Sequence, residues 1–345
     1  MNVRLHKYEL IFRFPAGTSR GVLKTKPAWL LLFSDENKTG IGEISRLPGL
    51  SYDDHPEFET KLLALITDFN RTGYQPNLTQ QLAAWPSIQF AFETGMADLH
   101  ATSHIYTDNR FTRGLDGIPI NGLIWMGERD WMLQQIDDKL NAGFRCLKMK
   151  IGAIGIETEL DILTSIRKRY SAGSLELRVD ANGAFNKNTV MPVLDRLAGL
   201  SIHSIEQPVK AGQPELMQKI CQNTPVPVAL DEELIGVTDP SEKNELLSYV
   251  SPQYIILKPG LLGGFRACED WMKRADCQNI KYWITSSLES NIGLNAIAQW
   301  TSTLGITMHQ GLGTGSLYEN NFNSPLHIQE DKLWFDPARK FSIKI

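Results

Sequence analysis

Ionisable residues recur along the middle of the chain at a nearly constant interval. Successive steps of 30, 26, 25 and 27 residues separate Lys150, Asp180, Glu206, Asp231 and Lys258. Each of these residues ends a short apolar run of the kind that forms a buried strand. An isolated charge in such a place is strongly destabilised, so the repeated pattern predicts that the five charges gather in one site.

The three acids of this series predict a metal site. Asp180, Glu206 and Asp231 would repel one another if they met at one edge of a sheet, and a divalent cation relieves that repulsion. A shell made only of oxygen atoms suits Mg²⁺, with Mn²⁺ able to substitute, better than zinc, because none of the three positions is Cys or His. No other cofactor is expected.

The lysines predict acid–base chemistry. Lys148 and Lys150 are two residues apart in a predicted strand and therefore point to the same side of the sheet. Desolvation, the neighbouring ammonium group and a nearby cation would each lower a lysine pKa toward that of a general base. Lys258 would approach from the opposite side, so a small carboxylate substrate between the lysines could lose its α-proton to form an enediolate.

Each of these residues alone has a simpler interpretation. A single acid at a strand end is more often a helix N-cap or a surface ion pair, but five strands in matched phase favour a functional site. Several further residues remain open: His203 is expected to be packed, His309 could line the pocket, Arg178 could pair with Asp180 or substrate, and Ser287 or Ser290 could cap a helix.

The elements that must position these residues form a repeating series. Eight short apolar runs alternate with helical segments, which predicts a (β/α)7β TIM-like barrel over residues 106–321, with an open doubly wound sheet as the alternative. The runs cover residues 118–125, 145–151, 175–181, 201–208, 226–232, 253–259, 281–287 and 305–311.

A smaller α+β capping domain is predicted for residues 1–105, with the tail 322–345 returning to it. Residues 3–14 and 27–35 have the pattern of strands, and residues 55–69 and 86–103 have that of amphipathic helices. The segment 15–26 between the strands is rich in Gly, Ser and basic residues and is predicted to be a mobile loop that closes over substrate.

Composition narrows the class of protein further. A net charge of −4 gives no basic stripe for nucleic acid, and the apolar run 28–33 is far too short for a membrane span. The four cysteines form no CxxC pair, so we expect them to be free thiols. Charged residues interrupt the N-terminal residues too often for an apolar signal segment, so we expect a cytoplasmic protein with no membrane partner. The oligomeric state is not predicted.

Five short motifs resemble the enolase superfamily, in its muconate-lactonising subgroup. The motifs are LKMK (147–150), RVDAN (178–182), IEQP (205–208), ALDE (229–232) and LKPG (257–260). GEISRLPGLSYD (42–53) and ITSSLESNIGLNAIAQ (284–299) are similar to the o-succinylbenzoate synthase family of menaquinone biosynthesis. A lysine base with Mg²⁺ is the known chemistry of the superfamily.

That resemblance implies a function and a set of roles. The implied reaction is the dehydration of 2-succinyl-6-hydroxy-2,4-cyclohexadiene-1-carboxylate to 2-succinylbenzoate. Lys150 would be the base, Lys148 would support it, and Lys258 would act from the opposite face, with Asp180, Glu206 and Asp231 on Mg²⁺. The implied substrate-binding residues are Ser286, Ser287, Gly311, Gly313 and Arg20.

Other members of the superfamily are the main alternatives. An N-acylamino acid racemase or dipeptide epimerase needs lysines on both faces, which this chain has. The epimerases with this fold carry an Asp-x-Asp at the eighth strand, whereas residues 308–315 contain no acid. A mandelate-racemase-like histidine is missing from 281–290, and a barrel used only for binding would not need all five charges.

Overall fold

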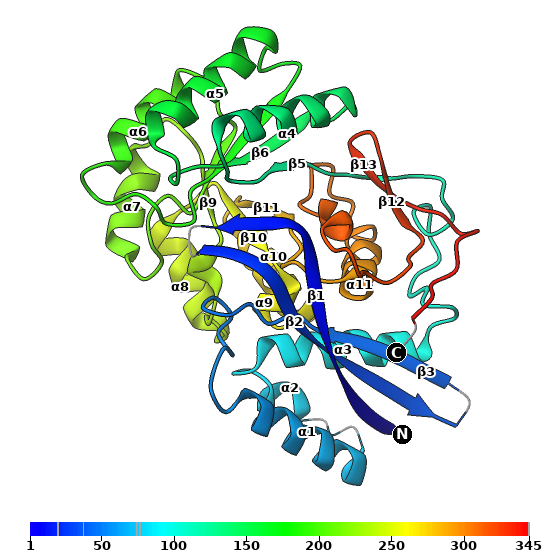
Figure 1. The fold of residues 1–345 in the computed structure, drawn as a ribbon. Coiled ribbons are helices and arrows are strands. Elements are labelled where there is room, and N and C mark those ends of the chain that lie inside the picture. Colours follow the sequence, from blue (N-terminus) through cyan, green and yellow to red (C-terminus); the bar gives the residue numbers. More distant parts are fainter. Residues whose placement is uncertain (19–20, 37, 74, 76, 344–345) are drawn as a thin grey trace.

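The computed structural model describes residues 1–18, 21–36, 38–73, 75 and 77–343, and it contains an α+β unit and a barrel (Figure 1). In the α+β unit, β1 (Asn2–Thr18), β2 (Gly21–Asp35) and β3 (Lys38–Ile44) form an antiparallel sheet in that order. Helices α1 (Phe58–Thr72), α2 (Leu78–Gln81) and α3 (Pro86–His100) follow. Alternate apolar residues of β2, including Trp29, Leu31 and Phe33, share one buried cluster with α1 and α3.

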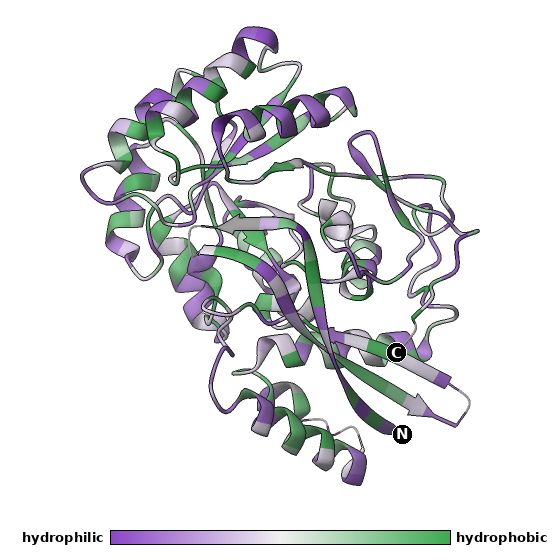
Figure 2. Ribbon diagram, in the orientation of Figure 1, coloured by the Kyte–Doolittle hydropathy of each residue, from purple (hydrophilic) through white to green (hydrophobic). Residues whose placement is uncertain are grey.

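The barrel is a parallel sheet of seven strands in sequence order, as the repeating pattern predicted. Its strands are β5 (Gly122–Ile124), β6 (Cys146–Lys150), β7 (Glu176–Asp180), β8 (Ser204–Glu206), β9 (Val228–Leu230), β10 (Tyr254–Leu257) and β11 (Lys281–Ile284). The strands are mainly hydrophobic, and the surrounding helices α4 (Arg129–Asn141) and α5 (Ile156–Arg169) carry hydrophilic stretches at the periphery (Figure 2).

Helices connect consecutive strands and return the chain to the same end of the barrel. They are α4 (Arg129–Asn141), α5 (Ile156–Arg169), α6 (Val190–Ala198), α7 (Pro214–Asn223), α8 (Pro240–Val250), α9 (Pro259–Leu262), α10 (Gly264–Cys277) and α11 (Asn291–Thr301). In α5, Leu160, Leu163 and Ile166 are buried at helical spacing, which fixes the face that covers the strands. Two short 3₁₀ helices are also present: Glu232–Leu234 follows β9, and Gly313–Ser316 follows residues 305–311.

The predicted eighth strand over residues 305–311 is wrong in extent. Only Gln310 and Gly311 form bridges there, Gln310 with Ile120 and Gly311 with Thr285. Through residues 310 and 311, these two parallel bridges connect the end of β11 to Ile120, just before β5, so the barrel closes. The pairing there is shorter than most of the strand pairing elsewhere in the barrel. The alternative of an open doubly wound sheet is therefore excluded.

The predicted loop over residues 15–26 is also wrong in extent. The first strand continues to Thr18 and the second begins at Gly21, with the register shifting between Ile11 and Ala16. Glycine and serine content suggested a break, but the two strands pair across the segment instead. Arg20, which was expected to reach the substrate from this segment, lies outside the described residues.

The last described segment contacts both units. Strands β12 (Leu326–Gln329) and β13 (Lys332–Phe335) form a hairpin, and β13 pairs with β4 (Ile118–Pro119) next to the barrel. Phe322, Phe341 and Ile343 pack with Leu30 of the cap sheet. The division at residues 105 and 322 stays a prediction.

Two further expectations concern the whole described chain. Its four cysteines are free thiols, three of them buried. Among the described residues, none of the helices has the length and apolar character needed to cross a bilayer.

The contact between the cap sheet and α3 gives a stability prediction. A Cβ on Gly42 would lie 1.8 Å from the Ala91 carbonyl oxygen, which is backbone and cannot move aside cheaply. We expect Gly42→Ala to lower the free energy of unfolding by about 1–3 kcal/mol or more, measured by urea denaturation. Gly173→Ala is the matched control, because the nearest atom to its Cβ would be 4.0 Å away. Equal stability of the two variants would contradict this packing.

Candidate active site

The ionisable residues of the series meet at one end of the barrel. Asp180 and Glu206 are the last residues of β7 and β8, and Asp231 immediately follows β9. Lys150 ends β6 and Lys258 immediately follows β10. Because the strands are parallel and in register, with Lys150 beside Asp180 and Asp180 beside Glu206, their carboxyl ends bring all these side chains together.

Each ammonium group contacts carboxylates from neighbouring strands. The Lys148 Nζ lies 2.7 Å from Glu206 Oε2 and 2.9 Å from Asp180 Oδ2. The Lys150 Nζ lies 3.2 Å from Asp180 Oδ2. Lysine and carboxylate therefore alternate across this part of the barrel.

Lys258 continues this alternation from the other side. It forms an ion pair with Asp231, and its Nζ lies 3.7 Å from Glu206 Oε1. Three strands, β7, β8 and β9, lie between β6 and β10 in the sheet, so Lys150 and Lys258 face each other across the barrel.

Two site residues were missed by the sequence reasoning. Asn182 Oδ1 accepts a hydrogen bond of 2.5 Å from Lys150 Nζ, and Asn182 Nδ2 donates one of 3.0 Å to Glu232 Oε1. Asn182 lies two positions beyond Asp180, and Glu232 lies next to Asp231. Both residues come just after the predicted strand ends, and this position could have identified them. The prediction was restricted to the last residue of each strand.

The electrostatics of the cluster differ from the sequence-based expectation. Burial lowers the pKa of Lys148 and of Lys258, but the adjoining carboxylates outweigh it and raise both values above the ordinary one. The prediction of lowered lysine pKa values considered the neighbouring ammonium groups and a cation, and left out the carboxylates that touch them.

The carboxylates themselves are strongly differentiated. Burial followed by the charge of Asp180 raises the pKa of Glu206 to about 7. Burial also acts to raise the pKa of Asp180, but Lys148 and Lys150 prevail and hold it well below its usual range. The pKa of Asp231 is raised, chiefly by burial. The site therefore favours added positive charge next to Glu206 and Asp231.

The residues present fit a divalent cation. Asp180, Glu206 and Asp231 are all buried and offer only oxygen ligands. Glu206 Oε1 is buried and has no hydrogen-bond partner among the residues that the structure describes. A buried carboxylate oxygen that accepts no hydrogen bond is costly, and a cation would satisfy it.

A cavity of about 340 Å³ opens onto these lysines. Of the predicted substrate-binding residues, Ser286, Ser287, Gly311 and Gly313 all line it. The cavity is also bordered by residues of the cap and by aromatic side chains of the barrel, namely Phe12, Phe14, Leu47, Leu50, Trp125, Trp131 and Phe144. The cap therefore forms part of the wall of the site.

A buried polar network holds the serine segment against the cap. Glu289 accepts hydrogen bonds from the hydroxyls of Ser286 and Ser287. Glu43 of β3 accepts from the Ser290 backbone N–H at 2.8 Å and from its hydroxyl at 2.6 Å.

Lys26 of β2 supplies the positive charge of this network. Its Nζ donates to Ser45 Oγ at 2.8 Å, and the Ser45 hydroxyl donates to the Ser287 carbonyl at 3.2 Å. Burial lowers the pKa of Lys26, and the charges of Glu43 and Glu289 oppose that change.

The structure settles the residues left open by the sequence. His309 lies beside Cys146 and Glu176, the first residues of β6 and β7, and is not among the residues that line the cavity, so the option that it lines the pocket is wrong. Arg178 pairs with Glu176 at 2.7 Å and not with Asp180, because two positions along the strand place it a layer deeper. Ser290 is the N-cap of α11, and His203 packs on Tyr254 and Trp283.

The barrel and its lysine–carboxylate cluster define a class of enzymes, and comparison with known families agrees. Residues 131–336 match the family described as enolase C-terminal domain-like, and the chain belongs to the enolase superfamily. The L-Ala-D/L-Glu epimerase structure from Bacillus subtilis matches with a TM-score of 0.81 at 19% identity, covering 99% of this chain and 97% of that one. That likeness supports the fold alone.

Within the superfamily the chain belongs with the o-succinylbenzoate synthases. It is 42% identical to the o-succinylbenzoate synthase of Desulfotalea psychrophila, over 95% of this chain and 97% of the relative. The crystal structure of MenC from Desulfotalea psychrophila matches with a TM-score of 0.85 at 38% identity, covering 97% of this chain and 99% of that one.

The cap network gives a second stability prediction. Lys26→Met should destabilise the protein by roughly 3–5 kcal/mol, because it leaves Glu43 and Glu289 buried without the ammonium that compensates them. Adding Glu43→Gln to that variant should recover part of the loss, which urea denaturation would measure. Lys24→Met, at an exposed position of the same strand, is the control and should change little. A fully additive double variant would argue against coupling between Lys26 and Glu43.

Proposed function

We propose that the protein is an o-succinylbenzoate synthase, a hydro-lyase that dehydrates 2-succinyl-6-hydroxy-2,4-cyclohexadiene-1-carboxylate to 2-succinylbenzoate. The observation that carries the reaction type is the meeting of three lysines, Lys148, Lys150 and Lys258, with three buried carboxylates at one end of the barrel. The three lysines also line the cavity there. The substrate is inferred from the 42% identical relative. The protein would thus act in menaquinone biosynthesis, and its cytoplasmic location stays a prediction.

Mg²⁺ would be held by Asp180, Glu206 and Asp231, with Mn²⁺ as a possible substitute. The support is the all-oxygen set and the buried Glu206 Oε1 without a hydrogen-bond partner among the described residues. When bound, the cation supplies Lewis acidity that stabilises negative charge on the substrate carboxylate.

The lysines have distinct roles in this proposal. Lys150 takes the proton from the ring carbon that bears the carboxylate, and Asn182, 2.5 Å from its Nζ, orients it. The same ammonium group then gives its proton to the departing hydroxyl, so the C–H and C–O bonds break and water leaves. Lys258 places positive charge on the opposite face, and Lys148 holds Asp180 and Glu206 in position.

The cavity wall would bind the rest of the substrate. Ser286, Ser287, Gly311 and Gly313 offer hydroxyl and backbone groups to the succinyl part, and Leu50 and Trp125 offer apolar surface to the ring. Arg20, which lies outside the described residues, is proposed as a further contact to the substrate.

A second candidate function is the isomerase reaction, N-acylamino acid racemisation or dipeptide epimerisation. The placement of Lys150 and Lys258 on opposite sides of the barrel favours it, since racemisation must return a proton to the opposite face. The lyase reaction needs only one lysine as proton carrier, so the two functions can be separated by variants.

Metal removal gives the first functional prediction. Exhaustive chelation should abolish dehydration, and Mg²⁺ or Mn²⁺ should restore it, because three buried carboxylates would otherwise repel. Activity is measured together with metal content. Glu206→Gln, of the same size, should remain folded and lose activity that added metal does not restore. Full turnover by protein shown to be free of metal would refute this part of the proposal.

The lysine roles give the second functional prediction. Lys150→Ala should slow dehydration by ~10²–10⁴-fold, the ordinary loss for a general base. Lys258→Arg keeps its charge but does not readily deprotonate, so it should retain measurable dehydration while losing any racemase activity. Lys281→Ala, at the exposed start of β11, is the control. If Lys258→Arg stops dehydration while racemisation of N-acyl amino acids survives, the isomerase function should replace the lyase function.

A further inference from the structure

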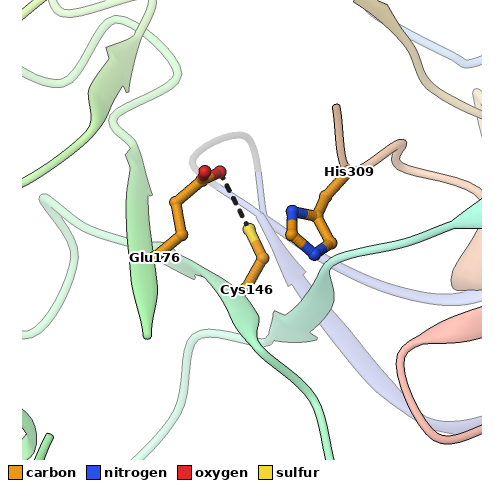
Figure 3. A group of neighbouring side chains, drawn as sticks. All are labelled: Cys146, Glu176 and His309. Carbon is orange, nitrogen blue, oxygen red and sulfur yellow. Dashed lines mark hydrogen bonds between the residues drawn. The ribbon is translucent and has the colours of Figure 1, made fainter. Parts of the chain in front are cut away.

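A second group of potential metal ligands lies at the opposite end of the barrel from the lysines. Cys146 is the first residue of β6 and Glu176 the first residue of β7, so both lie where the strands begin. His309 precedes Gln310, the residue that bridges to Ile120 and helps to close the barrel. Figure 3 shows the three side chains converging from these elements.

The spacing of the three side chains suits a small cation. One ligand atom from each residue can be chosen so that all lie within 4.8 Å of one another. Bonds of ~2.0–2.3 Å in a tetrahedral site put ligand atoms roughly 3.3–3.8 Å apart. The three side chains would therefore have to move only slightly closer together to bind a metal. The Cys146 thiol already donates to Glu176 Oε1 at 3.3 Å.

The chemistry of these donors differs from that of the catalytic end. A thiol, a carboxylate and an imidazole form a mixed set that suits zinc, whereas the catalytic acids offer oxygen alone. The side chain of His309 is largely buried but still reachable from solvent, and a neutral imidazole can bind a metal through either ring nitrogen.

Neighbouring groups act on two of the three residues. Arg178 donates to Glu176 Oε1 at 2.7 Å and to the His309 backbone carbonyl at 2.8 Å, which fixes both. Its positive charge opposes a bound cation, but metal binding releases the Cys146 proton and leaves a thiolate that compensates. Glu176 Oε2 lies 3.9 Å from His203 Nε2, so His203 or water could occupy a fourth position.

We propose that Cys146, Glu176 and His309 form a structural site for a borderline-soft divalent cation such as Zn²⁺. In binding, the Cys146 S–H bond breaks, a sulfur–metal bond forms, and the proton passes to solvent. The metal would link β6 and β7 to His309, next to the two isolated bridges that close the barrel. The partly exposed side chains of Glu176 and His309, 28% and 22%, give the ion a route from solvent.

Cobalt substitution tests the ligands. The metal-free protein, with saturating Mg²⁺ added to occupy the all-oxygen site, is titrated with Co²⁺. We expect a near-ultraviolet thiolate-to-cobalt band and the intense visible bands of tetrahedral cobalt, all removed by one equivalent of Zn²⁺. Cys146→Ser should lose the thiolate band, and Glu176→Gln should bind cobalt more weakly, by about tenfold or more. Cys277→Ser, which changes an exposed thiol, is the control and should keep the band.

Thermal unfolding tests the structural role. In excess Mg²⁺, stoichiometric Zn²⁺ should raise the Tm of the wild-type protein by roughly 2–4 °C or more and leave that of Cys146→Ser unchanged. Circular dichroism establishes that each variant is folded, and Glu176→Gln serves if Cys146→Ser is not. The proposal is overturned if folded wild-type protein gives no thiolate band, if the band persists in Cys146→Ser, or if Zn²⁺ binds without raising the Tm.

Discussion

The placement of three buried carboxylates at one end of a barrel is the constraint on which the rest of the structure depends. Asp180, Glu206 and Asp231 come from consecutive strands and cannot all be charged there without nearby positive charge. The chain meets this need by interleaving lysines, with Lys148 between Asp180 and Glu206 and Lys258 between Glu206 and Asp231. The in-register parallel strands make this alternation possible, because they bring one side chain per strand to the same level. The proposed chemistry uses the same charges, since groups that can stabilise buried carboxylates can also stabilise an enediolate.

The cap is joined to this centre by charge as well as by apolar packing. Glu43 of the cap accepts hydrogen bonds from Ser290, just beyond β11. Lys26 of the cap donates to Ser45, whose hydroxyl donates to the Ser287 carbonyl. Desolvation offsets much of the attraction within a buried ionic network, although removing one partner leaves the other charge buried and is costly. The cap therefore both covers the cavity and fixes the serine segment that lines it.

The sequence predicted the part of the molecule that repeats. A regular interval between ionisable residues at strand ends follows from the βα unit, so the residues of the cluster and the barrel could be predicted. The four cavity-lining positions at 286, 287, 311 and 313 were implied by the resemblance to a known family and not by the interval. What it could not predict depends on contacts between distant segments. The bond from Ser290 to Glu43 joins residues 247 positions apart, and no local pattern marks it. The first hairpin was interrupted in the prediction because Gly and Ser favour turns locally, whereas pairing between the strands decided the outcome. The partner of Arg178 was left open between Asp180 and substrate, because a period of two gives the side of a strand but not the depth of a side chain. In the structure Arg178 pairs with Glu176.

The most direct test of the central claim is a crystal structure with Mg²⁺ and 2-succinylbenzoate. The account predicts the metal at ~2.0–2.1 Å from oxygens of Asp180, Glu206 and Asp231. It also predicts the ring carboxylate of the product between Lys150 and Lys258, with the succinyl group toward Ser286 and Ser287. A metal bound elsewhere would contradict it. So would a product whose ring carboxylate lies away from both Lys150 and Lys258 although the contacts of Lys148 with Asp180 and Glu206 are intact.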